Sequence, residues 1–231
     1  MDILHTEPNL SLTTSQRVAF SQYAELLQAW NQKFNLTAIH TPDEIWSRHF
    51  LDSITCLRAM HNTPVDRVID VGTGAGFPGL VLKIVCPDMH LTLVESVGKK
   101  AAFCAEVVRI LGLENVDIHP TRAEELGHSP EHRAQYDWAV ARAVAPLPVL
   151  AEYLLPFVKE GGKMLAQKGR ETAQELNQAK NAFTLLGGEL DQILPVPVPG
   201  GDAHTLIVVA KTRPTPDRFP RRAGIPAKRP L

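Results

Sequence analysis

A glycine-rich segment carries the clearest chemical signal in the chain. Residues 70–79 read DVGTGAGFPG, and Gly74, Gly76 and Gly79 satisfy the GxGxxG spacing of dinucleotide-binding loops. Glycines at such a turn let the backbone bend sharply and let a cofactor lie against main-chain atoms. Glu95 stands 19 residues after Gly76, where a carboxylate can accept hydrogen bonds from both hydroxyls of an adenosine ribose. The segment therefore predicts a nucleotide-containing cofactor, against the alternative of a structural turn followed by a surface glutamate.

Two cofactors compete for this loop. Asp70 precedes Gly72 by two residues and can help to hold the cationic aminoacyl end of S-adenosylmethionine, whereas nicotinamide enzymes usually lack an acid there. About 150 residues follow the loop, too few for a second mononucleotide half and a substrate domain. A P-loop is excluded. The segment Gly98-Lys99-Lys100 is not preceded by the first glycine of that motif, and it is not followed by a serine or threonine. S-adenosylmethionine is favoured; a nicotinamide-dependent oxidoreductase and a non-catalytic cofactor-binding module remain alternatives.

Strands that alternate with helices are expected to position the loop. This order predicts an α/β fold, a Rossmann-like methyltransferase sheet with helices on both faces. An N-terminal helical extension (1–64) precedes the sheet domain (65–211). In the extension, a helix starts at Thr41 and places Trp46, Phe50, Ser53 and Leu57 on one side. An antiparallel C-terminal hairpin is expected around Pro199-Gly200-Gly201-Asp202. The expected strands are 68–71, 91–95, 116–119, 136–141, 163–167, 189–198 and 204–210, and the helices are 78–85, 98–111, one ending near 158, and 171–185, with a turn at Gly161-Gly162.

Composition restricts the class of protein. The chain has 231 residues, of which 44% are hydrophobic and 21% charged, which is typical of a globular protein and excludes disorder for its bulk. We expect no membrane span and no signal peptide, and therefore a cytoplasmic protein. Three cysteines without a CxxC pair argue against a disulfide framework and against a metal site.

The charge is unevenly distributed. Residues 211–231 carry seven basic residues and one acidic residue, although the whole chain has a net charge of −1. A basic end on an acidic body indicates a polyanionic partner, with a solubilising tail as the alternative. Five prolines lie in residues 212–231, so we expect this tail to be extended and poorly ordered.

Several motifs together resemble one known family. DVGTGAGFPG, ESVGKK, TRAEEL, DWAVARAVAPL, QKG, NLTAIHTPDEIWSRHFLDS and the tail RRAGIPAKRPL are similar to the bacterial RsmG family, also called glucose-inhibited division protein B. The resemblance implies an S-adenosylmethionine-dependent methyltransferase that modifies N7 of a guanine in 16S ribosomal RNA. It implies the RNA or the small ribosomal subunit as partner, no membrane, and a monomer.

The resemblance also implies site residues. It places cofactor contacts at Gly72, Phe77, Ala123, Glu124 and Arg142, beside Asp70, Gly74, Gly76 and Glu95 from the reasoning above. Glu124 has an alternative role as an acid at a helix N-terminus. The catalytic candidates are Arg142, expected to bridge cofactor and guanine, together with His49 and Asn35. For His49 a packing role is equally open.

Guanine N7 has a free lone pair, so its methylation needs alignment and no general base. In agreement, the chain lacks the Asn-Pro-Pro-Tyr segment of amino-directed methyltransferases, and Ala141-Arg142-Ala143 stands where a C5-pyrimidine nucleophile would be. Arg48 and Asp52 at i and i+4 have a simpler interpretation as a helix-surface pair. The candidates for RNA contact, with solvated charge as their alternative, are Arg48, Arg122, Lys168, Arg221, Arg222, Lys228 and Arg229.

Overall fold

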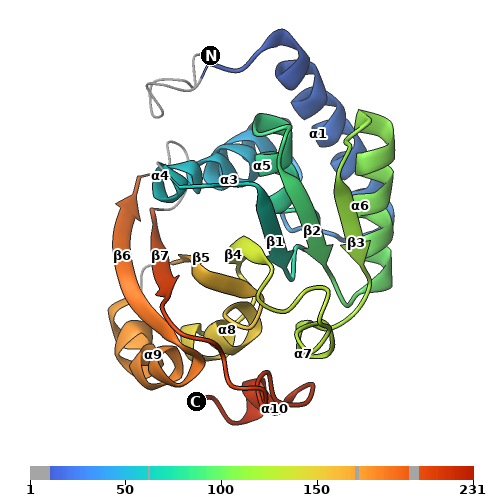
Figure 1. Cartoon of the computed structure of the whole chain (residues 1–231). Coiled ribbons are helices and arrows are strands. Elements are labelled where there is room, and N and C mark those ends of the chain that lie inside the picture. The colour runs from blue at the N-terminus through green and yellow to red at the C-terminus, as the bar shows by residue number, and fades with distance from the viewer. Residues whose placement is uncertain (1–10, 62, 170–171, 198–202) are drawn as a thin grey trace.

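A seven-stranded sheet forms the framework of the protein, in the order β3-β2-β1-β4-β5-β7-β6 (Figure 1). The computed structural model describes residues 11–61, 63–169, 172–197 and 203–231. Strands β1 to β5 pair in parallel, and β7 is antiparallel to both β5 and β6. The strands are β1 Arg67–Val71, β2 His90–Val94, β3 Val116–His119, β4 Tyr136–Arg142, β5 Val158–Lys168, β6 Gly188–Val196 and β7 His204–Lys211.

Helices cover both faces of the sheet, which confirms the predicted fold class. Successive residues of β1 alternate between two cores, because side chains of a strand point to opposite faces. Val68 belongs to the core that includes residues of α1 Thr14–Phe34, α5 Gly79–Val85 and α6 Gly98–Leu111. Ile69 belongs to the second core, with residues of α8 Leu147–Leu154 and α9 Thr172–Leu186. Among the described residues, no helix has the length and apolar composition needed to cross a membrane.

The hairpin of β6 and β7 is antiparallel as predicted, and its expected turn at 199–202 lies outside the described residues. The helix expected to end near residue 158 is present but ends earlier, and the turn expected at Gly161-Gly162 is wrong. Helix α8 ends at Leu154, and β5 passes through both glycines. A Cβ at Gly162 would come within 2.8 Å of Asp137 O, so glycine lets the neighbouring strand approach at an irregular point of the pairing.

The helix predicted from Thr41 begins there but is not regular. Thr41 Oγ1 accepts a hydrogen bond from Glu44 N–H at 3.3 Å, as a capping residue does. The segment then passes through α2 Pro42–Ile45, a π-helical turn Trp46–Leu51, α3 Asp52–Ile54 and α4 Leu57–Met60. A single amphipathic helix is therefore the wrong description of this segment, and π-helical turns are frequent at functional sites.

The C-terminal segment packs against the protein, which corrects the expectation of a poorly ordered tail. Phe219 is 4% exposed and joins the core beside α8. The guanidinium of Arg133 donates to the backbone oxygens of Phe219 at 2.7 Å and of Thr215 at 2.8 Å. A short helix, α10 Ile225–Lys228, follows near α8 (Figure 1). Proline-rich composition indicated an extended chain, but apolar burial and long-range hydrogen bonds fix its path.

Candidate active site

The glycine loop joins β1 to α5 and has open space on one side. Gly72, Gly74 and Gly76 have φ angles of 71°, 62° and 92°, a region that favours glycine. A Cβ at Gly72 would lie 2.7 Å from a methyl of Val144, and one at Gly76 would overlap the Tyr23 hydroxyl. A Cβ at Gly74 would have no atom closer than 4.0 Å. Two glycines therefore serve internal packing, whereas Gly74 faces free space.

Asp70 stabilises the loop from inside. Its side chain is fully buried, and Oδ2 accepts hydrogen bonds from Thr73 Oγ1 at 2.6 Å and from Gly79 N–H at 2.8 Å. Oδ1 is buried and has no partner among the described residues. Burial raises the pKa of Asp70 to about 6. The structure thus places this carboxylate beneath the loop, and its expected contact with the aminoacyl end of the cofactor stays a prediction.

Glu95 follows β2 and also contacts the loop. Its Oε2 accepts from Gly74 N–H at 2.9 Å, and its Oε1 accepts from Val97 N–H at 2.8 Å. The residue is 6% exposed. Each oxygen keeps a second lone pair, so Glu95 has acceptor capacity beyond these bonds, next to the free space at Gly74.

Ala123 and Glu124 begin α7 Ala123–Leu126, directly after the loop that follows β3. Both are buried, and Glu124 Oε1 accepts from Gly224 N–H of the C-terminal segment at 2.9 Å. Arg122 precedes them and is exposed. Glu124, one of the two cofactor residues predicted after β3, therefore contacts the C-terminal segment, a connection that the sequence did not indicate.

Phe77 connects the glycine loop to the N-terminal helices. The ring of His49 stacks on it with centroids 4.4 Å apart, and the Arg142 guanidinium lies 4.9 Å from its centroid. Arg142 Nη2 lies 3.1 Å from His49 Nδ1, and His49 Nε2 lies 2.9 Å from Thr37 Oγ1. Since a guanidinium only donates, Nδ1 is the acceptor and Nε2 carries the ring proton. Burial and the nearby Arg142 charge lower the pKa of His49 to about 3, so the ring is neutral at physiological pH.

Asp52 binds Arg142 instead of Arg48. Its Oδ2 lies 2.6 Å from Arg142 Nη1, whereas Arg48 lies 3.7 Å from a Glu44 oxygen, so the expected surface pair of Arg48 and Asp52 is wrong. His204 Nδ1 lies 2.8 Å from Asp52 Oδ1. Burial raises the pKa of Asp52, but His204 and Arg142 outweigh it, and the net shift is below the usual value.

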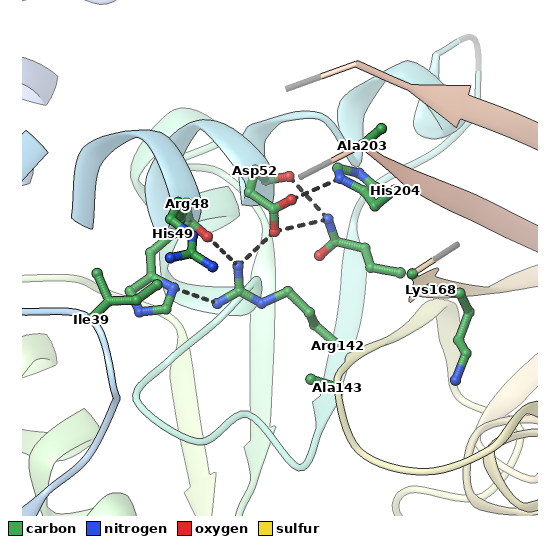
Figure 2. A pocket seen from close by; sticks show the side chains of 11 residues that line it. Ile39, Arg48, His49, Asp52, Arg142, Ala143, Lys168, Ala203 and His204 are labelled. Carbon is green, nitrogen blue, oxygen red and sulfur yellow. Dashed lines mark hydrogen bonds and ion pairs between the residues drawn. The ribbon is translucent and has the colours of Figure 1, made fainter. Parts of the chain in front are cut away.

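A cavity of about 380 Å³ opens beside these residues, at the C-terminal ends of β4 and β5 (Figure 2). In α/β sheets, ligands bind at this edge. Lys168 lies at the rim, where its Nζ contacts Glu175 Oε2 at 2.8 Å and Ala145 O at 3.1 Å. The residues that line the cavity are Ile39, Arg48, His49, Asp52, Arg142, Ala143, Gln167, Lys168, Gly169, Ala203 and His204.

The remaining predicted residues lie elsewhere. Asn35 is exposed at the end of α1, with a φ of 47°, and does not line the cavity. Arg221 forms an ion pair with buried Glu152 at 2.6 Å, so its guanidinium is used inside the protein, contrary to its expected role as an RNA contact. Of the residues of the C-terminal segment that were predicted to contact RNA, the exposed ones are Arg222, Lys228 and Arg229. Within the described residues, no cluster of His, Cys, Asp or Glu could hold a metal ion.

Sequence reasoning missed three residues of the site. Gln167 and His204 line the cavity, and Gln167 Nε2 donates to the Asp52 backbone oxygen at 3.0 Å. Gln167 belongs to the QKG motif, which was available as a signal. Nothing near His204 in the sequence marks it. Tyr23 donates to Ala75 O at 2.5 Å and supports the glycine loop from α1.

The chain is similar to several known proteins. Residues 16–197 match the family described as rRNA small subunit methyltransferase G, GidB. The ribosomal RNA small subunit methyltransferase G of Roseiflexus castenholzii is 49% identical over 226 residues, which cover 98% of this chain and 96% of that protein. A putative O-methyltransferase from Klebsiella pneumoniae has a similar structure, with a TM-score of 0.59, 13% identity and coverage of 92% and 96% of the two chains. A mutant of MtNAS in complex with S-adenosylmethionine gives a TM-score of 0.56, 16% identity and coverage of 86% and 76%.

Proposed function

Because the chain belongs to the rRNA small subunit methyltransferase G family, it transfers a methyl group from S-adenosylmethionine to ribosomal RNA, and we propose that the acceptor is N7 of a guanine held in the cavity beside Arg142. The observation that carries this proposal is the position of Arg142. Its guanidinium lies over Phe77 of the glycine loop and also lines the cavity, so one side chain borders both sites.

The glycine loop fits the cofactor. Open space at Gly74 leaves room for a ligand against the backbone, and the carboxylate of Glu95 beside it can accept bonds from the ribose hydroxyls. We place further cofactor contacts at Gly72, Gly76, Phe77, Ala123, Glu124 and Arg142, with Asp70 supporting the loop. When bound, S-adenosylmethionine supplies a methyl group on a sulfonium, which a ring nitrogen can attack directly.

The cavity residues suit a reaction that needs orientation and no base. The neutral His49 accepts a hydrogen bond from Arg142 through Nδ1, so no free ring nitrogen of His49 faces the cavity to take a proton. Arg142 has two N–H donors without an acceptor among the described residues, because its hydrogen bonds to Arg48 O, Asp52 Oδ2 and His49 Nδ1 engage three of its five N–H groups. Donation from Arg142 to the guanine O6 would orient the adjacent N7. Alignment of this kind can contribute up to ~7–11 kcal/mol.

The polyanionic substrate requires basic contacts around the site. Arg48 and Lys168 line the cavity, and Arg122 precedes α7. We assign the phosphate contacts to these three residues and to exposed Arg222, Lys228 and Arg229. The proposal further assigns the protein to the cytoplasm, as a monomer that acts on the small subunit or its 16S RNA.

The test is to map the methylated nucleotide. The protein is incubated with methyl-labelled S-adenosylmethionine and either small-subunit RNA or assembled small subunits, and the RNA is digested to nucleosides. We expect labelled 7-methylguanosine from the wild type and a large loss of label with Arg142→Ala, whereas Arg109→Ala, a change in an exposed pair on α6, keeps the activity. Label on any other nucleoside would contradict the proposal.

A further inference from the structure

The carboxylate of Asp52 is shared between two side chains from distant parts of the chain. Oδ2 lies 2.6 Å from Arg142 Nη1, and Oδ1 lies 2.8 Å from His204 Nδ1. The Asp52 backbone oxygen accepts from Gln167 Nε2 at 3.0 Å. Asp52 therefore joins the N-terminal helices to residues at the ends of β4, β5 and β7, as the dashed lines in Figure 2 show.

The π-helical turn brings a second acceptor to the same guanidinium. Asp52 N–H donates to the carbonyl of His49, three residues back. The carbonyl of Arg48 accepts from Arg142 Nη1 at 3.2 Å. His49 Nδ1 lies 3.1 Å from Arg142 Nη2. The guanidinium is therefore bound by three acceptors of the segment 48–52, which are the Arg48 carbonyl, His49 Nδ1 and the Asp52 carboxylate. Its position then depends on that segment and above all on the one charged acceptor, because charge-assisted hydrogen bonds are the strongest.

Methylation changes the charge next to Arg142. The lone pair of N7 forms the new nitrogen–carbon bond while the carbon–sulfur bond breaks. The electron pair of the carbon–sulfur bond stays on the sulfur. No proton leaves, so the guanine becomes a cation. A guanidinium without a counter-ion repels a second positive charge at short range, and a carboxylate bound to it cancels most of this repulsion.

We propose that Asp52 is a positioning residue for methyl transfer, which fixes the Arg142 guanidinium beside the guanine and neutralises its charge against the product cation. This inference rests on the proposed function, since it needs a ring nitrogen as the acceptor. Asp52 acts through Arg142, while Gln167 and His204 hold Asp52 in place.

The first variant is Asp52→Asn, which keeps the shape of the side chain and the backbone bond from Gln167. We expect its single-turnover methylation rate to fall about 100-fold, as for a reactant misplaced by about 1 Å. The dissociation constant of S-adenosylmethionine, measured by calorimetry, should change far less than the rate, because Glu95 and the open space at Gly74 do not depend on Asp52. Asp43→Asn is the matched control, because Asp43 is an exposed acid of the same segment, and it should leave both quantities unchanged. Asp52→Glu, which restores the charge, should recover part of the rate.

A second comparison does not use the Asp52→Asn single variant. Arg142→Gln and Asp52→Asn/Arg142→Gln both lack the ion pair, and the double variant has no unpaired charge. If Asp52 acts only through Arg142, the two should transfer methyl groups equally slowly. A double variant much slower than Arg142→Gln, or an Asp52→Asn enzyme as fast as the wild type, would overturn the inference. Absence of 7-methylguanosine from the wild-type reaction would instead refute the proposed function itself.

Discussion

The strongest test of the docked C-terminal segment is the substitution Arg221→Ala. The Arg221 side chain donates to both oxygens of Glu152, at 2.6 Å from Nη2 and 2.9 Å from Nε, and the Glu152 side chain is completely buried. Removing one partner of a buried ion pair usually costs about 3–5 kcal/mol. The backbone N–H of residue 221 still donates to Glu152 Oε1 at 2.7 Å in the variant, so we expect the lower end, about 3 kcal/mol. For a chain of this size, that corresponds to a fall in Tm of about 6–12 °C.

Urea and thermal unfolding followed by circular dichroism measure this loss directly. Arg222→Ala is the matched control, because Arg222 is the exposed neighbour, and it should change the free energy of unfolding by less than about 0.5 kcal/mol. Adding Glu152→Gln to Arg221→Ala should recover part of the loss, since a neutral amide is less costly to bury without a partner. If Arg221→Ala unfolds at the wild-type urea concentration, the ion pair does not hold the segment.

Four further outcomes are expected. Glu95→Ala should weaken S-adenosylmethionine binding by about 10- to 150-fold in calorimetry, because charge-assisted bonds of about 1.5–3 kcal/mol are lost. His49→Gln should reduce the loss of stability on acidification, measured by urea unfolding. The pKa of His49 is about 3 in the folded protein and about 6.5 in the unfolded chain, so the unfolded chain binds the proton first as the pH falls. This protonation lowers the free energy of unfolding of the wild type by up to about 1.4 kcal/mol per pH unit between pH 6.5 and pH 3. Burial lowers the pKa of Lys211 to about 7 from 10.5, so the free energy of unfolding of the wild type relative to that of Lys211→Met should rise from pH 7 towards 10.5. Changing Arg222, Lys228 and Arg229 to alanine should make RNA binding less dependent on salt. The slope of log K against log salt concentration should become shallower by ~0.7–0.9 for each phosphate contact that is lost.

The sequence predicted the sheet because each strand and helix is marked locally. The apolar run 68–71, the glycines after it and the later alternation of elements place the loop at the end of β1. The irregular entry to β5 was missed, since Gly161-Gly162 is also a common turn sequence and only the approach of Asp137 O reveals its role. The division into regions at residues 64 and 211 stays a prediction.

The candidate site was harder to predict because it depends on charges that meet across long distances in the chain. Arg142 was identified, but its partner Asp52 lies 90 residues earlier, and His204 lies on the last strand of the chain. Helical spacing pairs Asp52 with Arg48 at i and i+4. The π-helical turn changes that spacing. The Arg142 guanidinium is partly buried, so it needs protein acceptors more than an exposed guanidinium does, and it binds the carboxylate of Asp52.

Docking of the C-terminal segment changes how its charges can act on RNA. A disordered basic tail loses conformational freedom when it binds, and this loss reduces the affinity gained from each phosphate contact. Here the path of the segment is fixed before RNA arrives, by Phe219 in the core, by the pair of Arg221 with Glu152 and by Gly224 N–H on Glu124. Glu124 stands at the start of α7, among the residues proposed to bind the cofactor. The proposed function therefore places exposed charges such as Arg222 at a fixed distance from the residues proposed to bind the cofactor, and it predicts contact with one particular RNA surface instead of non-specific attraction to any polyanion.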